Sequence, residues 1–169
     1  MRTTRPRPLL DDKILTANNA LMISALAKAH RVLTSPKGGD GPPGRPSEAD
    51  RSESGPYLAT AIRAAEFIER ELHDATRGVL FRAWRDGRGA AEGFAEDYAY
   101  LVQALIDLYE ASFEVRWLQW AERLQAKLDE LFWDEPRGGY FNSATGDRSI
   151  VLRLKEDYEK NRELFVHLA

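Results

Sequence analysis

The stretch that decides the fold begins with Phe94-Ala95-Glu96-Asp97-Tyr98 and ends with Arg137-Gly138-Gly139-Tyr140-Phe141. Between these ends, apolar residues recur every three or four positions up to about residue 112 and again over about 117–132, with a break near 113–116. Such spacing is typical of helices with one buried face. The stretch therefore predicts a helical hairpin followed by a turn-rich strap.

The same unit occurs earlier in the chain. Residues 74–81 keep the Asp, the Arg-Gly pair and the final Phe of residues 134–141 at a spacing of 60. The first helix repeats at a spacing of 79, and the matched pairs are Leu21 with Tyr100, Ala25 with Ala104 and Leu26 with Leu105. The difference of 19 residues predicts an insertion in the first copy. Two helices per repeat are typical of an all-α repeat array or toroid.

The pattern divides the chain into an arm, two hairpins and a tail. We expect an arm over 1–13, a partial α/α unit over 14–158 and a divergent tail over 159–169. Within the unit, hairpin 1 covers about 14–73 and hairpin 2 about 95–132. Residues 34–55 lack large apolar side chains and are predicted to be a flexible insertion. Pro56 suits the first turn of the second helix, and 79–84 and 139–143 are predicted to pair as short strands.

The helices alternate in character along the chain. The first and third are apolar over a wide arc, whereas the second and fourth carry a narrower apolar stripe. This alternation favours the inner and outer helices of a two-layered toroid, although a flat solenoid fits nearly as well. Inner helices need neighbours on both sides. We therefore expect unpartnered residues at the open edges, which would make the chain self-associate: Leu21, Ile23, Leu105 and Leu108.

Composition narrows the function classes. The 169 residues are 43% hydrophobic and 30% charged with a net charge of −3, which gives no indication of a nucleic-acid or membrane surface. No apolar run approaches the roughly 20 residues that span a bilayer, and the basic N-terminus lacks the apolar stretch of a signal peptide. Without cysteine, disulfides and thiolate chemistry are excluded. The three histidines have no metal-ligand spacing, so neither a metal nor a cofactor is predicted.

Five segments of the chain form a recognisable set of motifs. They are Pro8-Leu9-Leu10-Asp11-Asp12-Lys13-Ile14-Leu15-Thr16, residues 21–29, Glu96-Asp97-Tyr98-Ala99, Leu131-Phe132-Trp133-Asp134 and residues 152–158. Together they resemble the spermatogenesis-associated protein 20 family. The resemblance covers about residues 6–158. It implies a piece of a longer chain in which a thioredoxin-like domain precedes an (α/α)6 toroid similar to sugar epimerases and six-hairpin glycosidases. The fold it implies is all-α: two helical hairpins of an incomplete (α/α)6 toroid with short β straps.

Two segments depart from the family pattern. Where the family has Ser-Trp-Asn-Gly, this chain has Ala17-Asn18-Asn19-Ala20, so only Asn19 matches. After Tyr158 the sequence also differs from the family. The thioredoxin-like part is not represented, so no redox role is carried over.

The resemblance to carbohydrate-active toroids directs attention to the acids before the inner helices. Glycoside hydrolysis needs two carboxyl groups, and Asp12, Glu96 and Asp97 are the candidate catalytic residues. The candidate substrate-binding residues are Asn19, Trp84, Tyr98, Glu156 and Asp157. The alternative for the acids is helix capping, which the position before a helix favours. For Tyr98 and Trp84 the alternative is packing, in the core and between the hairpins respectively.

Three functions remain open on sequence alone. The chain is part of a carbohydrate-active toroid that is inactive by itself, a non-catalytic interaction scaffold, or a truncated product without independent function. The expected partners are the missing hairpins of the same toroid or further copies of the chain, with carbohydrate as the candidate ligand.

Overall fold

The computed structural model describes residues 11–34, 48–146 and 152–155, and it describes no side chains for 48–54. The predicted arm up to residue 10, the tail and most of the insertion therefore lie outside the described residues. Four long helices dominate the described part: α1 (Thr16–Thr34), α2 (Glu48–Phe67), α3 (Ala95–Ser112) and α4 (Val115–Phe132). A π-helical turn, Ile68–Leu72, continues α2.

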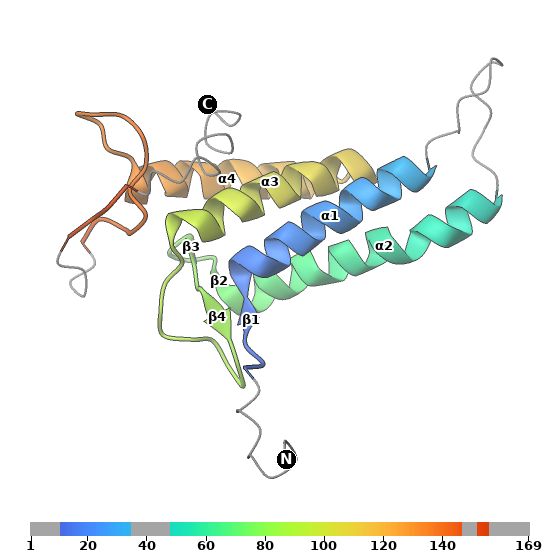
Figure 1. Cartoon of the computed structure of the whole chain (residues 1–169), viewed down its shortest axis with the longest axis horizontal. Coiled ribbons are helices and arrows are strands. Elements are labelled where there is room, and N and C mark those ends of the chain that lie inside the picture. Colours follow the sequence, from blue (N-terminus) through green and yellow to red (C-terminus); the bar gives the residue numbers. More distant parts are fainter. Residues whose placement is uncertain (1–10, 35–47, 147–151, 156–169) are drawn as a thin grey trace, which may run out of the picture.

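The helices form two hairpins that pack side by side (Figure 1). α1 packs most extensively against α3 and α2, and α3 packs against α4. α3 is the most enclosed helix, with both apolar and acidic residues buried: Ala95, Asp97, Tyr98, Ala99, Leu101, Val102, Ala104, Leu105, Asp107 and Leu108. α1 and α3 are thus the inner helices and α2 and α4 the outer ones. The predicted all-α fold of two hairpins with short strands is confirmed.

The second hairpin turns at Phe113. This residue has a φ of 58°, in the left-handed region, and its N–H donates to the Tyr109 carbonyl across 2.7 Å. Such a bond ends a helix by satisfying one of its last carbonyls. α4 then returns along α3 and buries the rings of Trp117, Trp120 and Phe132 in the core.

Four two-residue strands lie at the amino ends of the inner helices. β1 (Ile14–Leu15) pairs antiparallel with β4 (Ala83–Trp84), and β2 (His73–Asp74) pairs antiparallel with β3 (Val79–Leu80). The strap at 79–84 therefore pairs with residues that flank hairpin 1, and the predicted pairing with 139–143 is wrong. Within the described residues, the second strap closes on itself through the Trp133–Tyr140 bridge.

The start of α2 also differs from the prediction. The prediction placed it at Pro56 with a cap near Ser54 or Gly55, but the helix begins at Glu48 and carries Pro56 inside it. Residues 48–55 are therefore helical, and this part of the predicted flexible insertion is wrong. Glu48, Ala49 and Arg51 are good helix formers, so the segment before Pro56 has helical propensity, although a proline in a helix interior costs about 3 kcal/mol.

The predicted open edges are only partly open. Ile23, Leu105 and Leu108 have no exposed surface, so the expectation that they lack partners is wrong. The reason is that α1 and α3 pack on each other and on their outer helices, which covers these three positions. Leu21 is 50% exposed, as expected for an unpartnered position on the far side of α1.

This difference in burial gives the first prediction. Leu105→Ala should lower the free energy of unfolding by about 2–5 kcal/mol, because it leaves a cavity in a packed core. Leu21→Ala, on an exposed face, should change it by less than about 0.5 kcal/mol. Urea unfolding in dilute solution measures both. Equal decreases in the free energy of unfolding for the two variants would contradict the arrangement of the inner helices.

Candidate functional site

Asp97 joins the starts of the two inner helices. Its side chain is 1% exposed, and Oδ1 accepts a hydrogen bond of 3.1 Å from the N–H of Ala17, in the first turn of α1. Oδ2 accepts a second bond of 2.9 Å from the N–H of Phe94, the residue before α3. Free amides at helix starts need such acceptors. One carboxylate thus caps its own helix and the neighbouring inner helix.

The environment of this carboxylate shifts its titration. Burial raises the pKa of Asp97 from 3.8 to about 6, although the bonds from Phe94 and Ala17 and the nearby charge of Arg82 oppose the shift. The group therefore carries its charge at neutral pH and takes up a proton in mildly acidic solution. A carboxyl with a raised pKa can act as a general acid, but both oxygens of Asp97 already hold backbone amides. Its placement supports capping.

Arg82 connects Asp97 to a more exposed acid. Its Nη1 lies 3.0 Å from Oε1 of Glu96 and 3.6 Å from Oδ2 of Asp97, and the guanidinium stands over the ring of Phe94. The side chain of Glu96 is 32% exposed, so this carboxylate can reach solvent. Glu96 and Asp97 thus share one cation, and only Glu96 is open to a ligand.

The backbone around Arg82 is tied to α1. Thr16 donates its N–H to the Arg82 carbonyl across 3.0 Å and its hydroxyl to the Phe81 carbonyl across 2.6 Å. The segment between β3 and β4 is thereby held against the start of α1. This places the guanidinium beside the start of α3. Sequence reasoning missed Arg82, because its acidic partners lie 14 and 15 residues away and no local motif links them.

Asp12 and Asn19 lie at the same end of α1 but make separate contacts. Asp12 Oδ1 lies 2.9 Å from Nε of Arg85, and both side chains are about half exposed. Asn19 donates from Nδ2 to the Leu15 carbonyl across 2.9 Å. Neither contact reaches Glu96 or Asp97. Exposed ion pairs such as Asp12–Arg85 contribute about 0–1 kcal/mol.

The predicted aromatic positions pack against other rings. Tyr98 has no exposed surface; its hydroxyl accepts the N–H of Leu80 across 2.8 Å, and its ring packs on Phe132 at 5.5 Å. It therefore offers no face to a sugar, and core packing is its role. Trp84 is partly exposed and packs edge-on against Phe67 with 5.6 Å between ring centres. Glu156 and Asp157 lie outside the described residues.

The amino-acid sequence is similar to that of curated proteins over most of the chain. The chain is 40% identical to human spermatogenesis-associated protein 20 and 39% identical to the rat protein, in each case in an alignment of 167 residues that covers 94% of this chain. Over most of its length the chain is therefore similar to spermatogenesis-associated protein 20. It spans about a fifth (19%) of the length of these curated relatives. No protein-family model matches it.

Solved structures show the same fold at low sequence identity. An α-mannanase from Bacteroides thetaiotaomicron matches 82% of this chain with 34% of its own, at a TM-score of 0.61 and 16% identity. The cellobiose 2-epimerase of Spirochaeta thermophila matches 88% of this chain with 32% of its own, at a TM-score of 0.61 and 22% identity. The two hairpins thus correspond to about a third of a six-hairpin toroid.

Among the residues that the structure describes, no three acidic or histidine side chains gather so that they could hold a metal ion. No helix in the described ranges is long and apolar enough to cross a bilayer.

The titration of Asp97 gives the second prediction. Between about pH 4 and pH 6 the folded chain holds a proton on Asp97 that the unfolded chain has released, so raising the pH through this window lowers the free energy of unfolding. The loss should be on the order of 1–3 kcal/mol. It can be measured by chemical unfolding at a series of pH values.

Asp97→Asn is the control, because it removes this titration while the other acids remain. The variant should be less stable than the natural chain, since an amide cannot accept both backbone N–H bonds. Its deficit should shrink as the pH rises from about 4 to about 7. A deficit that grows over this range would contradict the raised pKa of Asp97.

Proposed function

We propose that this chain contributes two hairpins to a carbohydrate-binding toroid, with Glu96 as the acid that it presents at the toroid's mouth. The observation that supports this most is the placement of Glu96. It is a partly exposed carboxylate at the start of an inner helix, held 3.0 Å from Arg82, in a fold shared with an α-mannanase and a cellobiose 2-epimerase.

Each residue around Glu96 has a distinct part in the proposal. Asp97 aligns the starts of α1 and α3, which fixes the position from which Glu96 projects. Arg82 neutralises both acids and can donate from its guanidinium to a sugar hydroxyl. Glu96 is the residue available for proton transfer or for hydrogen bonding to a ligand. Tyr98 is left out, because it is buried.

We further propose that the chain alone does not turn over a sugar. Hydrolysis of a glycoside needs two carboxyl groups roughly 5–9.5 Å apart on either side of the bond. Of the three predicted acids, Asp97 is occupied by backbone amides and Asp12 is paired with Arg85. A second working acid would come from another inner helix, since the two hairpins match only about a third of the solved toroids.

A non-catalytic scaffold is the second candidate. It is favoured by the ion pairs and hydrogen bonds that all three predicted acids make within the chain. Such contacts suit acids with a structural role. In this case the toroid would bind a ligand without transforming it.

A test of the proposed function needs a full-length relative that carries the same Glu-Asp-Tyr-Ala segment. We expect calorimetry to detect binding of reducing disaccharides or mannosides. If the relative turns them over, the change corresponding to Glu96→Gln should lower kcat by at least about 100-fold, the low end for loss of a general acid or base.

Glu122→Gln is the matched control, because Glu122 is an exposed acid on the outer helix α4. It should leave binding and turnover unchanged. Binding without turnover would support the scaffold. Absence of binding to every sugar tested would refute the carbohydrate link, and full turnover in the Glu96→Gln form would remove Glu96 from the chemistry.

A further inference from the structure

One face of α1 carries exposed residues from its first turn to its last. We call it the outer face of α1, and its members are all exposed: Asn18, Leu21, Met22, Ala25 and Val32. Met22 and Val32 are 58% and 74% exposed, respectively. α1 uses other positions against its neighbours, since its buried residues are Thr16, Ala17, Ala20, Ile23 and Ala27.

The internal repeat shows what covers the equivalent face in the second hairpin. At the spacing of 79, the outer face of α1 corresponds to a set on α3: Asp97, Tyr100, Leu101, Ala104 and Ala111. This is the side of α3 that meets α1, because Asp97 accepts the Ala17 amide and Asp107 pairs with Lys28. On α3, therefore, another inner helix already occupies the face that is exposed on α1.

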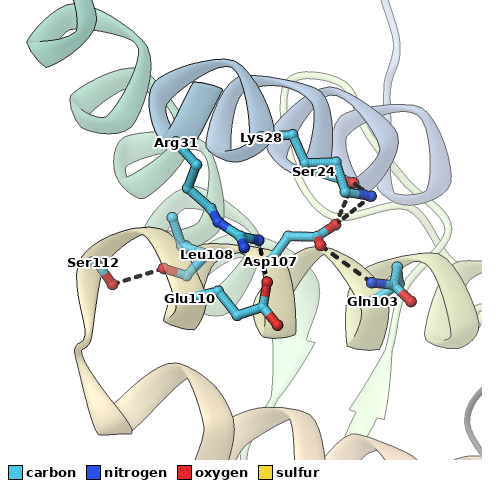
Figure 2. A network of polar contacts seen from close by, with 8 residues as sticks. All are labelled: Ser24, Lys28, Arg31, Gln103, Asp107, Leu108, Glu110 and Ser112. Atoms are coloured by element: carbon cyan, nitrogen blue, oxygen red, sulfur yellow. Dashed lines mark hydrogen bonds and ion pairs between the residues drawn. The ribbon is translucent and has the colours of Figure 1, made fainter. Parts of the chain in front are cut away.

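Charged residues at matched positions set the register of this contact. Lys28 Nζ lies 2.9 Å from Oδ2 of Asp107, and Arg31 forms an ion pair with Glu110 (Figure 2). In each pair the two residues are 79 apart, so they occupy the same repeat position on neighbouring inner helices. Matched positions of α1 and α3 thus carry opposite charges at two successive levels.

A second set of positions on α3, which we call the outer face of α3, consists of Gln103, Ile106 and Glu110. Within the chain, Glu110 also pairs with Arg31 and Gln103 also donates to Asp107. The three positions of this set correspond by repeat to Ser24, Ala27 and Arg31, which lie on the α3-facing side of α1. Gln103 and Ile106 are partly exposed and Glu110 is exposed. The outer face of α3 thus occupies the repeat positions that, on α1, contact the next inner helix.

We propose that a second copy of this chain docks its outer face of α1 on the outer face of α3, and that three copies close into a six-hairpin ring. The contact repeats the one between α1 and α3 within the chain. Asp107 and Glu110 of one copy then meet Lys28 and Arg31 of the next, so charges alternate around the ring. This inference goes beyond the proposed function and does not rest on it.

Two physical arguments favour this head-to-tail contact. In a parallel arrangement, α1 against α1 or α3 against α3 would oppose like charges at both levels, which disfavours these pairings. A head-to-tail interface closes a ring when its rotation divides a full turn. The two hairpins match 34% and 32% of two solved toroids, so three copies supply the hairpins of one.

The first test is the mass of the 169-residue chain in solution. Sedimentation at about 100 µM, above the Kd of a micromolar interface, should show a species of about 58 kDa, three times the 19.2 kDa of one chain. A monomer, a two-fold dimer or an open-ended filament under these conditions would each overturn the proposal.

Point variants distinguish this specific contact from nonspecific association. Met22→Glu places a charge in the proposed interface and should leave the chain monomeric at the same concentration. Val115→Glu is the matched control, since Val115 is 55% exposed and belongs to α4, which contributes to neither outer face, and it should leave the trimer intact. Equal effects of the two changes would contradict the proposed surface.

A charge exchange tests the register. Arg31→Glu alone sets acids against Glu110 within and between chains, so the trimer should dissociate. The double change Arg31→Glu with Glu110→Arg restores opposite charges at every contact and should restore the trimer. If the double variant stays monomeric while its circular dichroism shows a folded chain, the proposed register is wrong.

Mixing two variants tests the head-to-tail geometry. Met22→Glu blocks the outer face of α1, and Ile106→Glu blocks the outer face of α3. Each alone should be monomeric, and the mixture should form a one-to-one dimer through the single intact interface. If Ile106→Glu does not fold, Glu110→Arg blocks the same face. A mixture that stays monomeric would refute the proposed pairing of faces.

Discussion

The described structure depends on one buried carboxylate that serves two helices. Asp97 receives the first amides of its own helix region and of α1, 80 residues earlier in the chain. A helix start leaves four amides without partners, and burying them unsatisfied is costly. By supplying one acceptor to each inner helix, Asp97 fixes their relative height. The other features of this end, including Arg82 and Glu96, are placed by that alignment.

The alignment has consequences along the full length of the inner helices. Once α1 and α3 start level with each other, residues at the same repeat position face one another, which is why Lys28 meets Asp107 and Arg31 meets Glu110. Small residues such as Ala20 and Ala104 have no exposed surface, as expected in a closely packed interior. Each of the four strands is only two residues long. They hold the straps across the helix starts and bring Arg82 to the acids.

Sequence patterns predicted the helical architecture well, because it repeats. The matched pairs Leu21–Tyr100 and Ala25–Ala104 identified the inner helices, and their packing against each other followed. Asp97 was predicted to have one of two roles, and its contacts support capping. The start of α2 was predicted incorrectly, because Pro56 was taken for a first-turn residue whereas it lies inside the helix. The strand partners and Arg82 depend on contacts between distant segments, and two-residue strands have no periodicity that would indicate them.

The most direct measurement of the central claim is the hydrogen exchange of the Ala17 amide. Ala17 lies in the first turn of α1, where an amide has no acceptor within its own helix and normally exchanges fast. If Asp97 holds it, this amide should exchange as slowly as the core amides of α3, and Asp97→Asn should release it while Leu105 stays protected. Fast exchange at Ala17 in the natural chain would contradict the account, because the two inner helices would then have no shared cap.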